Sequence, residues 1–184
     1  MSNIRGFIVL LMLGLVAACT TPPPETTASG VTLLRESDTQ AVLTSHVDAL
    51  NAFRASRGLP PVTLSAQLTA AARTHARDMS VQERQWHFGS DGTAPPDRVR
   101  RAGYTGRWIG ENIAESYDDV IQSFQSWVDD PATRRVMLTP EADNVGLGWF
   151  QEPDGKLWWV QVLGQSGGTP QMVAFSGPSA LPES

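Results

Sequence analysis

The 184-residue chain has only one cysteine, Cys19, so it contains no internal disulfide bond. It has no stretch dense in lysine and arginine beyond Arg98, Arg100 and Arg101, and its net charge is −5. This acidic balance argues against nucleic acid as a partner. The apolar run at residues 6–18 is too short to span a bilayer as a helix of the mature protein.

The first 18 residues have the pattern of a bacterial lipoprotein signal peptide. Arg5 provides a short positive segment, the apolar run follows, and small residues stand directly before Cys19. This resembles a lipobox, in which the cysteine carries acyl chains such as palmitate and becomes the first mature residue; the alternative is an ordinary secretory signal with a chance cysteine. By the same resemblance, Thr20 in place of aspartate favours the outer membrane. We therefore expect a protein anchored in the cell envelope by lipid at Cys19, facing the periplasm.

The rest of the sequence predicts one domain between two less structured ends. Hydrophobic residues make up 41% of the chain and charged residues 18%, which fits one globular domain with a sizeable core. Residues 19–37 contain three consecutive prolines with scattered Thr, Ser and Gly, and are interpreted as the lipidated cysteine and a flexible tether. Residues 38–165 form the predicted domain, and residues 166–184 a loose tail rich in Gly, Ser and Pro.

Hydrophobic spacing predicts helices first and strands afterwards. Helical spacing or helix-starting residues occur in segments 41–57, 65–82, 97–102, 118–128 and 131–138. Two apolar stretches, 145–150 and 157–163, flank Pro153-Asp154-Gly155 and predict a β-hairpin.

The most informative polar group lies in Trp108-Ile109-Gly110-Glu111-Asn112-Ile113. If the two isoleucines point inward, Glu111 lies beside packed surface, and it needs hydrogen-bond donors or a cation to keep its pKa from rising. His87 is the best partner candidate. The alternative is a strand or loop with a capped glutamate and no further role.

The other two histidines have structural interpretations. His75 lies on the apolar face of the second helix, which favours a core histidine bonded to a backbone carbonyl over a ligand. His46 is expected to be half exposed and receives no role.

An ordered set of motifs resembles the CAP superfamily, also called SCP domains, which includes the cysteine-rich secretory proteins, antigen 5 and the pathogenesis-related proteins. The set covers roughly residues 40 to 164 and is most similar to the short bacterial branch. The resemblance implies an α/β fold: a three-layer α-β-α sandwich with a central, mainly antiparallel sheet and helices on both faces. The matching residues are Asn51-Ala52-Phe53-Arg54, Arg57 to Val62, Leu68, Ala71-Ala72, His75-Ala76, Asp78-Met79, His87, Asp91-Gly92, Arg98, Ala102-Gly103-Tyr104, Gly110 to Ile113, Trp127, Arg134, Val145 to Gly148 and Trp159-Val160-Gln161.

The resemblance also implies a cleft with two histidines and two acidic residues, which hold zinc or another divalent ion in some members. His87 matches the first histidine and Glu111 the first acid. Thr133 stands where the second histidine is expected, and Asp130 or Asp129 at the second acid. Zinc needs about three protein ligands, and a neutral hydroxyl is a poor one, so we expect no metal and no other cofactor. The expected cleft comprises His87, Glu111, Asn112, Asp130, Thr133 and Arg134.

Two functions remain open. The favoured one is a non-enzymatic binding or scaffold module whose cleft holds an extended or apolar ligand, such as a lipid, a peptide or peptidoglycan. The alternative is a hydrolase in which His87 and Glu111 activate water. The G-x-S-x-G match at residues 164–168 is rejected as a nucleophile elbow because every histidine precedes Ser166 and no helix follows it.

Overall fold

The computed structural model describes residues 25–28, 30–116 and 119–167. The predicted signal peptide, Cys19 and the tail beyond Gly167 lie outside these residues. No helix within the described ranges is both long enough and apolar enough to cross a membrane.

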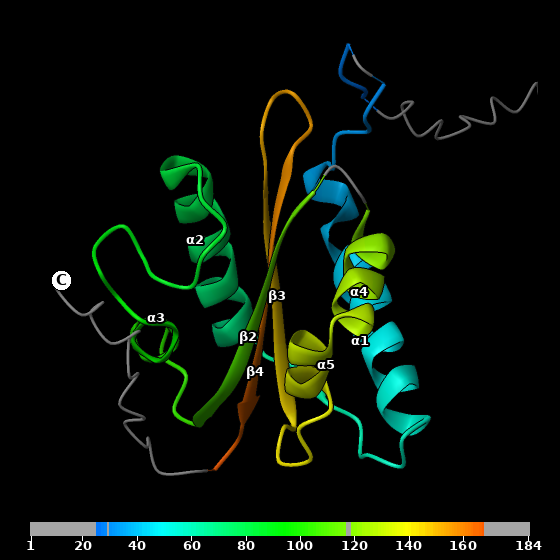
Figure 1. The fold of residues 1–184 in the computed structure, drawn as a ribbon, viewed down its shortest axis with the longest axis vertical. Coiled ribbons are helices and arrows are strands. Elements are labelled where there is room, and N and C mark those ends of the chain that lie inside the picture. The colour runs from blue at the N-terminus through cyan, green and yellow to red at the C-terminus, as the bar shows by residue number, and fades with distance from the viewer. Residues whose placement is uncertain (1–24, 29, 117–118, 168–184) are drawn as a thin grey trace, which may run out of the picture.

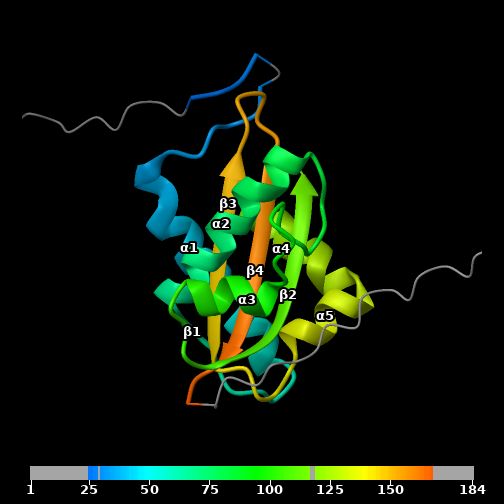
Figure 2. The ribbon, with the colours of Figure 1, turned by 90° about the vertical axis from the view of Figure 1, so that its left-hand side faces the viewer.

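The described residues form a sheet between two layers of helices (Figure 1). Helices α2 and α3 cover one face, whereas α1, α4 and α5 cover the other; Figure 2 shows α2 and α3 in front of the sheet. The predicted three-layer α-β-α sandwich is therefore confirmed. In chain order the elements are a 3-10 turn at Glu36–Asp38, α1 (Thr39–Ala55), β1 (Thr63–Leu64), α2 (Ala66–Gln82), α3 (Pro95–Arg101), β2 (Arg107–Ser116), α4 (Val120–Asp129), α5 (Pro131–Met137), β3 (Asn144–Gln151) and β4 (Leu157–Gln165).

The sheet has the strand order β1-β3-β4-β2 and is mainly antiparallel, as expected. Strand β4 pairs antiparallel with both β3 and β2, and the predicted hairpin is the β3–β4 pair. Strand β2 lies at one edge of the sheet. The other edge belongs to β3 from Gly146 onward, because the short parallel β1 pairs only with Asn144 and Val145.

Two glycines of β3 allow α2 to lie directly on the sheet. A Cβ atom at Gly146 would meet the backbone of Leu68, and one at Gly148 would meet the backbone of Arg73. Any larger residue at either position would push the helix away from the strand. This close contact fixes α2, and with it His75, against the face of the sheet.

The inner face of α1 repeats every four residues as Val42, His46, Leu50 and Arg54, all of them buried. The expectation that His46 is half exposed is therefore wrong: its relative exposure is 0%. Arg54 is equally buried. Its guanidinium donates to backbone carbonyls of the loop after α1 and of the end of α5 and the loop that follows it: those of Pro60, Met137, Thr139 and Ala142.

Part of the segment assigned to the tether contacts the domain. The Gln151 side chain accepts a hydrogen bond from the Leu34 amide at 2.8 Å and donates to the Thr32 carbonyl at 3.1 Å. These bonds place residues 32–34 beside the end of β3.

Candidate functional site

Glu111 and His87 form a direct contact on the α2 side of β2. Glu111 lies on that strand, and its side chain is only 2% exposed. His87 lies in the loop between α2 and α3, with a side chain that is 42% exposed. Its Nδ1 lies 2.9 Å from Glu111 Oε1. The predicted contact is confirmed, whereas a catalytic role for the pair stays a prediction.

Arg98 supplies a cation to Glu111, a partner that the sequence did not identify. Its Nη2 donates to both carboxylate oxygens, at 3.0 Å to Oε1 and 2.9 Å to Oε2. Its Nη1 donates to the carbonyls of His87 and Thr93. One guanidinium therefore holds the carboxylate and the backbone of the histidine loop together.

His75 supports the same loop from α2. Its Nε2 lies 2.9 Å from the Trp86 carbonyl, which confirms the predicted core histidine bonded to backbone. Because a carbonyl only accepts, Nε2 carries the proton. Burial lowers the pKa of His75, although the charge of Glu111, 3.8 Å from Nε2, opposes this effect. His75 is therefore neutral at pH 7.

The charge of Glu111 results from two opposing effects. Burial raises its pKa. The hydrogen bond from His87 and the positive charge of Arg98 lower the pKa by more than burial raises it, so the pKa of Glu111 lies below its ordinary value. An ionised carboxylate can only accept hydrogen bonds. His87 therefore donates through Nδ1–H, which leaves Nε2 as the ring nitrogen available to a ligand or a water molecule.

Asn112 directs its side chain to the opposite face of β2, because successive side chains alternate along a strand. There its Nδ2 donates to the Thr133 carbonyl at 3.0 Å and to Gln161 Oε1 at 3.1 Å. Gln161 Nε2 lies 2.9 Å from His46 Nε2. Asn112 thus belongs to a buried polar network under α4 and α5, on the far side of the sheet from Glu111.

The side chains of Asp130, Thr133 and Arg134 make hydrogen bonds to backbone groups where α4 ends and α5 begins. Asp130 accepts from the amides of Ala132 and Thr133 as the helix N-cap, and the Thr133 hydroxyl donates to the Trp127 carbonyl. Arg134 donates to the carbonyl of Val128 at the end of α4. Asp129, the alternative acid, accepts from Gln125.

The two groups of expected cleft residues lie on opposite faces of β2, and hydrogen bonds to one backbone carbonyl connect the elements around them. The carbonyl of Ile113 accepts from Gln85 Nε2 on the histidine loop, at 3.2 Å, and from the Trp127 indole of α4, at 3.1 Å. The strand thus separates His87 and Glu111 from Asn112 and Thr133, and these hydrogen bonds connect the two sides.

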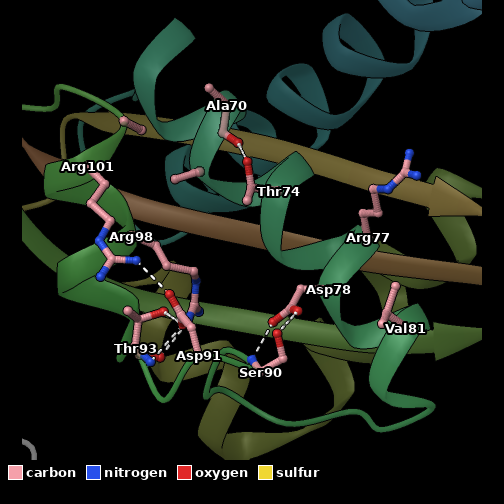
Figure 3. Close-up of a pocket in the computed structure, with 12 residues that line it drawn as sticks. Ala70, Thr74, Arg77, Asp78, Val81, Ser90, Asp91, Thr93, Arg98 and Arg101 are labelled. Atoms are coloured by element: carbon pink, nitrogen blue, oxygen red, sulfur yellow. Dashed lines mark hydrogen bonds and ion pairs between the residues drawn. The ribbon is translucent and has the colours of Figure 1, made fainter.

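A groove of about 530 Å³ lies on the outer side of the ion pair, between α2 and α3 (Figure 3). Ala70, Ala71 and Ala102 contribute small apolar side chains to its lining, and Arg98 lines it as well as holding Glu111. Figure 3 shows Arg77 and Val81 on the α2 side and Asp91 and Arg101 on the opposite side. Asp78, Ser90, Thr74 and Thr93 complete the lining.

The family model of the cysteine-rich secretory protein (CAP) family matches residues 47–163, more than half of the chain. The chain belongs to the CAP family. This match covers His87, Glu111 and Thr133, so the CAP domain contains both faces of β2.

Known proteins with related sequence or fold agree with this assignment. The uncharacterized protein YkwD of Bacillus subtilis is 26% identical over 119 residues, which are 65% of this chain and 46% of that protein. The chain therefore spans less than half the length of this relative. An extracellular SCP-domain protein of Bacillus anthracis is 20% identical with a TM-score of 0.64, covering 73% of this chain and 45% of that one. An outer surface protein of Borrelia burgdorferi is 15% identical with a TM-score of 0.62, covering 72% and 96%.

The zinc site of some CAP proteins does not fit the residues present here. Both Glu111 oxygens accept from Arg98, and the Thr133 hydroxyl is bonded to a backbone carbonyl on the other side of β2. Within residues 25–28, 30–116 and 119–167, no group of three or more His, Cys, Asp or Glu side chains is arranged to hold a metal ion.

Proposed function

We propose that the chain is a cell-envelope lipoprotein whose CAP domain is a non-enzymatic binding module. The observation that carries this proposal is the groove between α2 and α3, which shares Arg98 with the Glu111–His87 pair. Its volume of about 530 Å³ falls in the range of small-molecule sites, roughly 300–1,000 Å³. Arg98 donates to four acceptor atoms, on Glu111, His87 and Thr93, so its guanidinium is held in one position.

The lining of the groove favours an extended or apolar ligand with a polar end. Alanines at positions 70, 71 and 102 give a ligand chain little steric hindrance, and Val81 is 75% exposed at one end. Arg98, Arg77 and Arg101 supply polar groups along the same lining, and Arg98 links it to the His87 loop through the His87 carbonyl. A lipid, a peptide or a peptidoglycan fragment combines these properties.

The envelope location is supported by the sequence before the domain. The lipobox-like residues precede Cys19, and two structural relatives are named as an extracellular and an outer surface protein. The proposed anchor is an acylated Cys19 in the outer membrane. Intact mass and detergent partitioning test it: acylation and loss of membrane binding in Cys19→Ser are expected, whereas an unmodified thiol contradicts the anchor.

Mass spectrometry of molecules that co-purify with the full chain tests the binding function. Thr74→Trp places a large ring in the groove and is expected to remove most of the bound ligand. Ala66→Trp, at an exposed position of α2 outside the groove lining, is the matched control. Equal ligand content in both variants, or no ligand in the wild type, contradicts the proposal.

A hydrolase is the second candidate, and the Nδ1–Glu111 contact favours it. Glu111 fixes the ring of His87 so that Nε2 faces outward, in the position of a general base for water. Hydrolysis of a bound ester or amide that disappears in His87→Gln, with ligand binding retained, is the result that supports this candidate. Unchanged hydrolysis in that variant eliminates it.

A further inference from the structure

A second pocket lies at the open edge of β3, the opposite edge of the sheet from β2 and Glu111, and shares Arg77 with the groove between α2 and α3. Its volume is about 260 Å³. It is bounded by the segment before α1, by α2 and by the end of β3, where β1 no longer covers the strand. We call it the arginine notch, and its lining comprises Leu34, Arg35, Glu36, Thr39, Arg73, Arg77, Trp149 and Phe150.

Two arginines of α2 are held over aromatic rings in this notch. The guanidinium of Arg73 lies 5.5 Å from the centre of the Trp149 ring, and that of Arg77 lies 5.5 Å from the centre of the Phe150 ring. The two residues are one helical turn apart, so they project from the same side of α2. Trp149 itself packs against Trp159, which is fully buried. The rings thus restrict both guanidiniums before any ligand arrives, which lowers the entropy cost of binding.

The charges around the notch leave these arginines without a carboxylate partner. Among the described residues, no Asp or Glu lies within ion-pair distance of Arg73 or Arg77, although the chain has 19 acidic and 14 basic residues. Glu36 is the acidic residue in the lining of the notch, and its side chain is exposed to solvent. Arg35 adds a third positive charge and pairs with Asp38 at 3.4 Å.

We propose that the arginine notch binds a phosphate group, with Arg73 and Arg77 as the two cationic contacts. A guanidinium presents parallel N–H donors that match two oxygens of an oxyanion. The non-bridging oxygens of one phosphate group can accept from both guanidiniums at once. Thr39 lines the same notch, and a threonine hydroxyl can donate a further hydrogen bond to phosphate.

Two sources can supply this group. One is a soluble phosphate ester, and the other is the headgroup of an anionic lipid. The notch contains Leu34 and Arg35, which lie on the stretch of chain that leads from the domain toward Cys19. A lipid source depends on the proposed anchor, but binding of soluble phosphate does not, so failure of the anchor leaves the phosphate site testable.

The test follows the arginine Nε–H signals of the full chain in neutral detergent micelles by ¹⁵N NMR. Inorganic phosphate is titrated at constant ionic strength with chloride as the competing anion. We expect the Arg73 and Arg77 signals to shift saturably, with a dissociation constant on the order of 1 mM. Micelles containing phosphatidylglycerol are then compared with micelles containing phosphatidylcholine; a shift that appears only with phosphatidylglycerol assigns the lipid source.

The matched control removes the same charge and the same type of contact elsewhere. Arg73→Gln/Arg77→Gln is expected to weaken phosphate binding at least about tenfold. Arg57→Gln/Arg84→Gln removes two arginines that also lie over aromatic rings, those of Phe53 and Trp86, and is expected to bind as the wild type does. Equal binding by the two double variants, or no saturable shift in the wild type, overturns the proposal.

Discussion

The two faces of β2 surround neighbouring polar side chains with different electrostatic environments, one charged and one neutral. On the α2 side, Glu111 is ionised and is surrounded by Arg98, His87 and His75. On the α5 side, Asn112 belongs to a network of neutral amides, one carbonyl and His46. Both side chains are buried, but only the first group includes a residue, His87, that is substantially exposed. A buried charge is tolerated where a paired cation and hydrogen-bond donors compensate it, as Arg98 and His87 do for Glu111.

On the neutral face, the hydrogen bonds determine the orientation of the Asn112 and Gln161 amides and the tautomer of His46. The Thr133 carbonyl requires the Nδ2 of Asn112, which then also donates to Gln161 Oε1. Gln161 must therefore present its Nε2 to His46. His46 Nε2 accepts, and its proton sits on Nδ1. Protonating this histidine would place two donors face to face, so the network excludes a charge.

The largest expected effect is the loss of Arg98 on the charged face. Arg98→Met leaves Glu111 with an uncompensated buried charge and should cost about 3–5 kcal/mol of unfolding free energy. Urea denaturation measures it, with Arg100→Met as the control; that exposed residue pairs with Asp97, and its removal should change stability by about 0.5 kcal/mol or less. Adding Glu111→Gln to Arg98→Met should recover part of the loss. A loss of the control's size would mean that Arg98 does not hold the carboxylate.

Placing a charge on the neutral face should be nearly as harmful. Asn112→Asp sets a carboxylate against the Thr133 carbonyl and Gln161 Oε1, both of which are acceptors. We expect a loss of about 2–4 kcal/mol at pH 7, decreasing at acidic pH as the new group takes up a proton. A stability equal to that of the wild type at pH 7 would show that this face accepts charge.

The neutral face also predicts a pH dependence. Burial lowers the pKa of His46 to about 3, so its stabilising contribution is present above the unfolded value of about 6.5 and is lost as the pH falls below it. At pH 5 the loss amounts to about 2 kcal/mol. His75, whose pKa is also lowered by burial, adds to this loss. Urea denaturation between pH 7 and 5 should show a shallower slope in His46→Gln than in the wild type, and identical slopes would contradict the burial of a neutral histidine.

The smallest effect concerns the start of α5. Thr133→Val removes the hydroxyl that donates to the Trp127 carbonyl and should cost about 0.5–1.5 kcal/mol. Thr139→Val, whose hydroxyl donates to the exposed Arg135 carbonyl at 3.2 Å, is the control, with a smaller expected loss. Thermal unfolding of the two variants ranks them, and the reverse order would show that the Thr133 bond contributes little.

The sequence predicted the contact between His87 and Glu111, because a glutamate beside packed surface needs a partner and family resemblance places that histidine nearby. The condition that Ile109 and Ile113 both point inward is met only in part, since both are half-buried and they pack against different core clusters. It did not identify Arg98 as the cation. Arg98, Arg100 and Arg101 form one cluster in the sequence, and only the packing of α3 decides which of them points inward. The burial of His46 was predictable in principle, since Val42, His46 and Leu50 follow a four-residue period.

The expected cleft shows a different limit. Glu111 and Asn112 are neighbours in sequence, and the resemblance assigns both to one site, yet the pleat of β2 sends them to opposite faces. Strand alternation alone separates the two side chains, but the sequence left open whether this stretch is a strand or a loop. Where α5 crosses this edge strand depends on tertiary packing, which no local pattern encodes.

The carboxyl group of Glu111 provides the most direct test of the whole account. Burial alone would raise its pKa, whereas Arg98 and His87 are inferred to lower it. A ¹³C NMR titration of the side-chain carboxyl should give a midpoint below the ordinary glutamate value of about 4.3. A midpoint above that value would mean that burial dominates, and Glu111 would then be a proton donor rather than the fixed anion of a binding site.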